Sequence, residues 1–121
     1  MINETLKFKI KSNHYEISDV RIGHFIDFER LKATLSAGMY GSIFRMGTRT
    51  GDEALTMIDI EAFFTVFCPK LMEDLQCKSF KELGLVDYMS IKEVYTEKII
   101  PWYNEYIKLL DNRKDDVKAE K

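Results

Sequence analysis

The chain has few cysteines, no excess of either charge and no long apolar run. Its two cysteines, Cys68 and Cys77, are nine positions apart, a spacing that matches no zinc or redox motif, so we expect unpaired thiols. Eighteen basic and twenty acidic residues give a net charge of -2, which provides no electrostatic reason to expect nucleic acid as a partner. No apolar run approaches the roughly 20 residues that cross a bilayer, and the N-terminus lacks signal-peptide features. These absences predict a cytoplasmic protein that binds neither membrane nor nucleic acid.

Residues suited to catalysis or metal binding are also scarce. The two histidines, His14 and His24, form no ligand pattern such as His-x-x-x-His. Asp52, Glu53, Asp59 and Glu61 cluster in the sequence, but Asp59 and Glu61 fall on different sides of a helix. We therefore interpret these acidic residues as a solvent-exposed face together with the charge at a helix start. No glycine-rich turn presents a cysteine as a nucleophile. We therefore predict no enzymatic activity, no metal and no cofactor.

Length and composition predict one globular domain. Apolar residues make up 45% of the 121 residues and charged residues 31%, which is ordinary for a soluble protein large enough to form a core without metal or disulfide. The last eleven residues are mostly charged and have little to bury. We expect a single domain over residues 1–110 and a charged flexible tail over residues 111–121.

The most apolar stretch, residues 52–68, predicts a buried helix that the rest of the chain covers. Its apolar residues recur at spacings of three and four, as in Met57, Ile60, Phe64 and Phe67. Residues 58–61 also alternate as in a strand, but strands are usually about five or six residues long. Thr50 and Glu53 form a capping-box pattern at the start, and Pro69 cannot continue the helix.

The N-terminal segment predicts a β-hairpin. Residues 5–11 alternate between apolar residues and lysines, and residues 15–20 predict a second strand. With residues 13–14 at the tip, Ile10 lies opposite Ile17 and the charged residues also pair. Two strands alone are marginally stable in water, so this hairpin packs on the helices, pairs with strands of another copy, or does both.

Other segments predict further helices. They are residues 21–36, a short helix from Pro69 through Leu75, a brief one at 79–84 and a long one from Ser90 to Leu110. Pro101 either kinks that long helix or divides it into two that meet at Ile100. Residues 38–51 are rich in glycine and predict mostly a mobile connection, in which Ile43, Phe44 and Met46 allow a short turn of helix. The fold class is therefore α+β, mostly α, with an N-terminal hairpin packed on a bundle of about four to five helices.

Two groups of residues are candidates for binding. Arg45 and Arg49 lie among glycines and threonines before a helix start, which is suited to an anion, although a plain flexible loop is the alternative. The second group is apolar and aromatic, and it either packs in the core or meets a protein partner. Its members are Phe8, Ile10, Tyr15, Ile17, Trp102, Tyr103 and Tyr106.

Several short segments resemble the tail assembly chaperones of tailed bacteriophages. They are residues 8–11 (Phe-Lys-Ile-Lys), 15–17 (Tyr-Glu-Ile) and 22–26 (Ile-Gly-His-Phe-Ile), with 67–71 and 101–106 later in the chain. The resemblance implies a small, mostly helical, non-enzymatic protein that forms oligomers in the cytoplasm of the infected bacterium. Its implied partner is the long helical tape-measure protein, which it would keep from aggregating until the tail tube polymerises.

Two other functional classes remain open from the sequence. The first is a small structural protein of the virion, such as a capsid-associated or connector protein. The second is a small anion-binding domain that uses Arg45 and Arg49.

Overall fold

The computed structural model describes the backbone of residues 5–119 and the side chains of residues 5–110. Its elements are β1 (Leu6–Ile10), β2 (Asn13–Ile17), α1 (Ile22–Leu35), α2 (Tyr40–Met46), α3 (Arg49–Phe67), α4 (Pro69–Leu75), the 3₁₀ turn η1 (Phe80–Glu82), α5 (Leu85–Val94), the π-turn η2 (Tyr95–Ile99) and α6 (Ile100–Ala119). The prediction of a mostly helical α+β fold with an N-terminal hairpin is confirmed.

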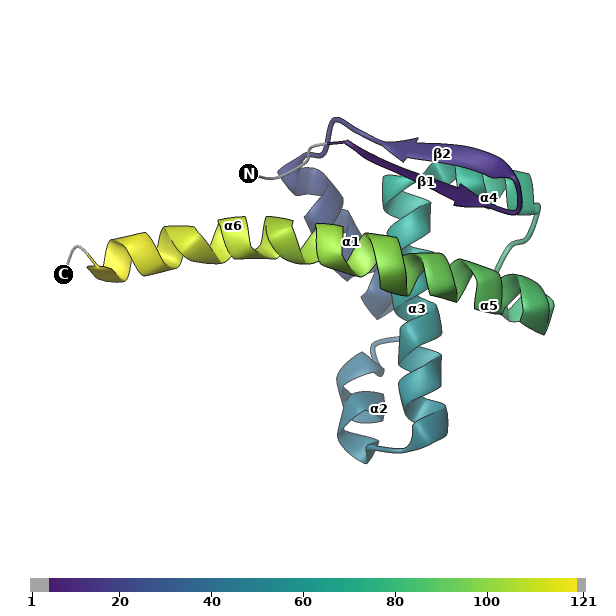
Figure 1. Ribbon diagram of the computed structural model, residues 1–121. Helices are drawn as coiled ribbons and strands as arrows, with labels where there is room; N and C mark the ends of the chain where they lie inside the picture. Colours follow the sequence, from purple (N-terminus) through teal and green to yellow (C-terminus); the bar gives the residue numbers. More distant parts are fainter. Residues whose placement is uncertain (1–4, 120–121) are drawn as a thin grey trace.

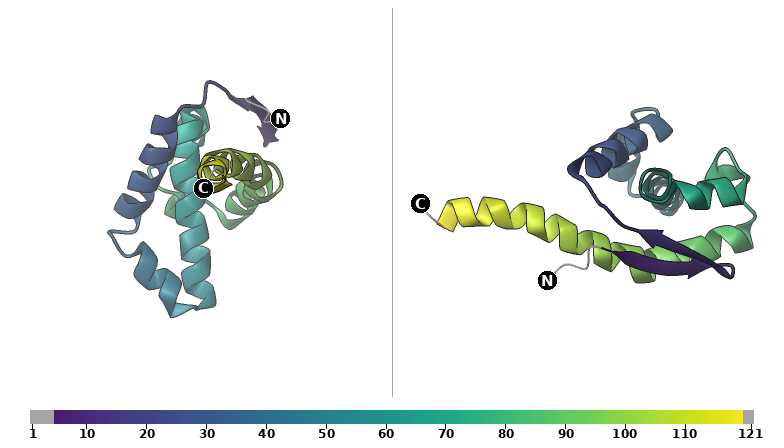
Figure 2. Two further views of the ribbon diagram at one scale, coloured as in Figure 1. Left: turned by 90° about the vertical axis from the view of Figure 1, so that its left-hand side faces the viewer. Right: turned by 90° about the horizontal axis from the view of Figure 1, so that it is seen from above.

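Helix α3 is the central element of the fold. In Figure 2 (left), α1 and α2 line one side of it, and the hairpin and the α5–α6 segment lie on the other. The helix starts at Arg49, because the Thr48 side chain accepts a hydrogen bond from the Gly51 amide at 3.1 Å. The start is thus earlier than the capping box at Thr50 predicts. It ends at Phe67, before Pro69, as predicted.

The hairpin forms, but its predicted register is wrong. Lys11 and Ser12 make the turn, both with positive φ, and Phe8 lies opposite Tyr15. Two successive positive φ angles give a two-residue turn whose twist matches that of the strands. The predicted and observed registers differ by an even number of residues, so both keep the same side chains on the apolar face. The alternation therefore predicts the face but cannot choose the register.

Helix α1 ends in a hydrogen-bonded cap. The Gly38 amide donates to the Ala33 carbonyl at 2.8 Å and the Ala37 amide to the Thr34 carbonyl at 3.1 Å, which is the Schellman pattern. Residues 40–46 then form helix α2 against α3, so the helix is longer than the short turn expected around Ile43 and the prediction of a mostly mobile connection is wrong here. Figure 1 shows α2 beside the lower half of α3.

The last helices also differ in detail from the prediction. The short helix from Pro69 to Leu75 is confirmed as α4. The long helical segment begins at Leu85 rather than at Ser90. Ser90 lies inside α5, where its hydroxyl donates to the Val86 carbonyl at 3.1 Å instead of capping a helix start.

Helices α5 and α6 form one continuous segment through the π-turn η2. The Ile100 amide donates to the Tyr95 carbonyl, five residues back, immediately before Pro101. Proline lacks an amide proton and clashes with the carbonyl four residues earlier in a regular α-helix, so a wider turn at this point accommodates it. Of the two alternatives left open by the sequence, one continuous helical segment matches this structure. Figure 1 shows this segment crossing in front of α3.

The core lies where α3 crosses α1 and the α5–α6 segment, and Phe63 is at its centre. Its ring stacks on that of Phe67 at 4.5 Å and meets the rings of Phe28 and Trp102 edge-on. On the hairpin side, the ring of Phe8 lies 5.8 Å from that of Phe64. Aromatic packing therefore joins the hairpin, α1, α3 and α6 into one body.

The last turns of α6 overlap the tail predicted over residues 111–121. The helical backbone continues to Ala119, and the side chains after Leu110 lie outside the described residues. The flexible tail over residues 111–121 therefore stays a prediction.

Candidate partner-binding surface

The structure places most of the predicted partner-binding residues in the chain's own core. All are buried or half-buried: Phe8, Ile10, Tyr15, Ile17 and Trp102 are buried, and Tyr103 and Tyr106 are half-buried. The hairpin residues lie against α3, α4 and α5, and the two tyrosines pack on Phe25 of α1. Of the two interpretations of these residues, core packing matches their positions in this conformation.

The two arginines predicted to bind an anion do not lie in a loop. Arg45 is in the last turn of α2 and Arg49 is the first residue of α3, and both are exposed. The Arg45 guanidinium approaches the Ser42 hydroxyl at 3.5 Å. Neither arginine lines the hollows described below. Anion binding by this pair stays a prediction.

The histidine and cysteine side chains have local structural roles. His24 Nδ1 accepts a hydrogen bond from the Arg21 amide at 2.9 Å, which caps the start of α1. Cys68 and Cys77 are free thiols, as predicted, and burial raises the pKa of both. Within the described residues, no group of three or more histidine, cysteine, aspartate or glutamate residues could hold a metal ion.

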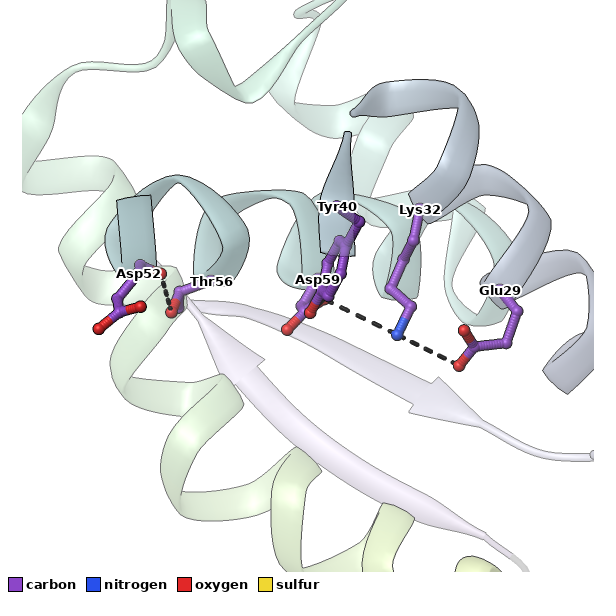
Figure 3. A network of polar contacts seen from close by, with 6 residues as sticks. All are labelled: Glu29, Lys32, Tyr40, Asp52, Thr56 and Asp59. Atoms are coloured by element: carbon purple, nitrogen blue, oxygen red, sulfur yellow. Dashed lines mark hydrogen bonds and ion pairs between the residues drawn. The ribbon is translucent and has the colours of Figure 1, made fainter. Parts of the chain in front are cut away.

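A polar network joins the three helices α1, α2 and α3 (Figure 3). The Tyr40 hydroxyl donates to Asp59 Oδ1 at 2.8 Å, and Lys32 Nζ lies 3.9 Å from the same oxygen and 3.2 Å from Glu29 Oε1. Burial raises the pKa of the Asp59 carboxyl, and the Tyr40 hydrogen bond and the Lys32 charge act against that rise. This satisfied network docks α2 on the protein body.

Glu61 is buried rather than solvent-exposed, so its interpretation as part of an exposed face is wrong. Its carboxylate accepts a hydrogen bond from the Phe80 amide at 2.6 Å and lies 3.4 Å from the Ser79 hydroxyl. Helix α3 thus supplies a hydrogen-bond acceptor for the backbone at the start of η1, because a buried amide needs an acceptor. The Glu61 carboxylate therefore has a structural role.

The two most exposed large apolar residues among those described are neighbours at the start of α5, Val86 at 79% and Leu85 at 74%. Met89, one turn further on, is 49% exposed, and we call these three residues the α5 ridge. Two hollows adjoin the ridge, with volumes of about 610 Å³ along α5 and about 540 Å³ between α3 and α5. The second is also lined by Ala54 and Met57 of α3. An apolar ridge beside two apolar-lined hollows is the usual form of a protein-docking surface.

The rim of the α5 ridge is charged and mostly acidic. Lys92 Nζ contacts both carboxylate oxygens of Glu53, at 3.0 and 3.1 Å, and so ties α5 to α3 between the two hollows. Glu93 and Glu97 line the hollow along α5. Because the only basic residue lining these hollows is already paired, the rim favours a partner with positive charge.

One polar atom beside the ridge is left without a partner. The Tyr88 hydroxyl is buried and has no hydrogen-bond partner among the described residues, and burial raises the pKa of Tyr88. Tyr88 lines the hollow between α3 and α5. A buried hydroxyl without a hydrogen-bond partner is unfavourable, so Tyr88 is a weak point in the contact between α3 and α5.

Two smaller apolar surfaces lie elsewhere. One is on α2, where Phe44 and Met46 are 68% and 67% exposed. The other lies between the start of α1 and α6, where Ile22, Leu109 and Leu110 line a hollow of about 160 Å³. The hollows at the α5 ridge are several times larger, so we regard the ridge as the principal candidate.

The α5 ridge is not evident from the spacing of residues in the sequence. Leu85 and Val86 precede Ser90, where the sequence predicts the helix to begin, so no helical face is assigned to them. One feature of the sequence could have revealed the ridge. Gly84 permits a helix to start at Leu85, and this start would place Leu85, Val86 and Met89 in the first turns of that helix.

The chain was compared with protein-family models, with curated proteins and with solved structures, and none of the three comparisons gives a match. No helix in the described part of the chain is long and apolar enough to cross a membrane.

Proposed function

We propose that this protein is a non-enzymatic assembly protein that binds a basic amphipathic helix of another protein at the α5 ridge. The observation that carries the proposal is the exposure of Leu85, Val86 and Met89 beside two apolar-lined hollows. A helix presents apolar side chains every three or four residues, which suits a ridge flanked by hollows. The acidic side chains of Glu93 and Glu97 would pair with basic residues on the same partner helix.

The sequence resemblance gives this proposal its specific form, a tail assembly chaperone acting in the cytoplasm of an infected bacterium. Its client would be the tape-measure protein, a long helical chain whose apolar faces need cover before the tail forms. An exposed apolar ridge on a domain that has its own packed core suits repeated binding along such a client. Contact through this one ridge would bury a small area at each site, which would let the chaperone leave when the tail tube assembles.

Co-expression with the tape-measure protein of the same phage tests the proposal. The wild-type chain should keep the client soluble and elute with it. Val86→Asp should abolish the complex, because it places a charge in the apolar contact, while the free energy of unfolding stays within about 0.5 kcal/mol of wild type. Met46→Asp is the matched control, since Met46 is about as exposed but lies on α2. It should leave the complex intact.

Two results would contradict the proposal. If the wild-type chain fails to solubilise the client, the chaperone function is wrong. If Val86→Asp and Met46→Asp weaken the complex equally, the α5 ridge is not the docking site. Mass spectrometry of purified particles separates the chaperone from a virion component, because a chaperone leaves before maturation and a structural protein remains.

A further inference from the structure

The hairpin has one edge beside a helix and one edge without a strand partner. Residues on β1 contact α5, and Lys11 at the turn forms an ion pair with Asp87 of α5. Strand β2 is the last strand of the described sheet, so no strand pairs with its outer edge. In Figure 1, β2 lies on the side of the hairpin away from α5. The outer edge of β2 is therefore open to a further strand, whereas the edge of β1 lies beside α5.

The register fixes which backbone groups face outward on β2. In a two-residue hairpin, the pair beside the turn exchanges both hydrogen bonds, and bonded and non-bonded pairs then alternate. Ile10 and Asn13 are the pair beside the turn, so the pairs Lys9–His14 and Lys7–Glu16 are non-bonded. The amide and carbonyl groups of His14 and Glu16 therefore point outward along the open edge.

The geometry points to pairing of this edge with the same edge of a second copy of the chain. When two β2 strands lie antiparallel and centred on Tyr15, each His14 falls opposite Glu16 of the other copy. The outward backbone groups at these two positions then meet and exchange hydrogen bonds. The result is a four-stranded antiparallel sheet with a two-fold axis, which is the closed form of association.

Side chains favour this pairing over the alternatives. On the outer face, each Glu16 carboxylate lies beside a His14 ring, which can donate a hydrogen bond to it. On the inner face, Tyr15 is already buried and donates to Asp74 of its own chain, so the backbone groups and the outer face carry the pairing. Pairing of two β1 edges would instead place Lys7 beside Lys9, and like charges opposite each other are unfavourable.

A hollow of about 540 Å³ lies beside the hairpin. It is lined by Lys7, Phe8 and Lys9 of β1, by His14, Tyr15 and Glu16 of β2, and by Cys68 and Lys70 at the start of α4. The α5 ridge plays no part in this contact, so the self-association is independent of client binding.

Sedimentation equilibrium of the full chain tests the inference. The wild type should show twice the 14.2 kDa mass of one chain. Glu16→Pro should abolish the dimer, because it removes an outward amide without removing a hydrogen bond of the hairpin. Glu16→Lys should weaken association about tenfold, since two favourable cross-strand pairs become unfavourable. Circular dichroism and thermal melting of each variant check that the fold is kept.

A charge exchange separates loss of pairing from loss of folding. The double variant His14→Glu with Glu16→Lys restores opposite charges across the pair and should restore the dimer. Val86→Asp should dimerise as the wild type does. In hydrogen exchange, raising the protein concentration should slow exchange at the His14 and Glu16 amides and leave the Lys9 amide unchanged.

Each contrary result overturns the inference. A mass of one chain at every concentration excludes the dimer. A dimer that survives Glu16→Pro, or one lost in Val86→Asp, places the contact elsewhere. Failure of the double variant to associate, with its fold intact, removes the assigned pairing of His14 with Glu16.

Discussion

The two halves of α3 are packed in different ways. The C-terminal half, from Ile60 to Phe67, is enclosed by aromatic rings of α1, α6 and the hairpin. The N-terminal half is covered by the short helix α2 and the first turns of α5, and here a hydrogen bond and an ion pair hold the contacts. Apolar residues stay exposed on both covering helices. The C-terminal half of α3 therefore provides stability, and the surface around its N-terminal half remains available to a partner.

The largest expected effect comes from the enclosed half. Phe63→Ala should lower the free energy of unfolding by about 3–5 kcal/mol, because it removes a fully buried ring that contacts several others. Chemical denaturation measures the change. Phe44→Ala on α2 is the control, and its effect should stay within about 0.5 kcal/mol because Phe44 is mostly exposed. Equal losses in the two variants would show that the halves do not differ.

An intermediate effect is expected where a polar contact holds α2. Tyr40→Phe removes the hydrogen bond to Asp59 and leaves that half-buried carboxylate with Lys32 as its remaining partner. The free energy of unfolding should fall by about 1–2 kcal/mol. Hydrogen exchange should speed up first in α2, since it is the element that loses its attachment. Uniform acceleration through α1 and α3 would contradict a local role for this bond.

The smallest effect should have the opposite sign. Tyr88→Phe removes the buried hydroxyl that has no partner and keeps the ring in place. The free energy of unfolding should rise by about 0.5–1 kcal/mol. Tyr15→Phe is the matched control, because the Tyr15 hydroxyl donates to Asp74 at 2.7 Å, and it should be destabilising. A loss of stability in Tyr88→Phe would show that its hydroxyl does have a partner.

The sequence predicts the elements of the enclosed half better than those of the other half. The alternation in residues 5–11 and the spacing in residues 52–68 reflect burial against a single core, so local patterns suffice to predict them. The helical spacing of Ile60, Phe64 and Phe67 still does not include Phe63, the most central ring. A single-face pattern misses this residue because α3 is covered on more than one side.

The other half depends on contacts between distant parts of the chain. Helix α2 is short and lies in the glycine-rich segment 38–51, and Tyr40 holds it through Asp59, nineteen residues further on. Glu61 is likewise occupied by the Phe80 amide. Neither partner can be identified from spacing along the chain. The hairpin register shows a third limit, because two registers place the same residues on the same face.

The π-turn has a consequence for the rotational phase of the last helix. Ile91 and Ile99 are both fully buried, yet eight steps of about 100° would leave them about 80° apart around a regular α-helix. The wider turn absorbs one residue, so the eight steps act as seven and the two side chains align to within about 20°. Deleting one residue between Tyr95 and Ile99 would therefore leave a regular α-helix that still carries Trp102 into the core, whereas forcing the turn into α-helix without a deletion would rotate Trp102 by about 100°.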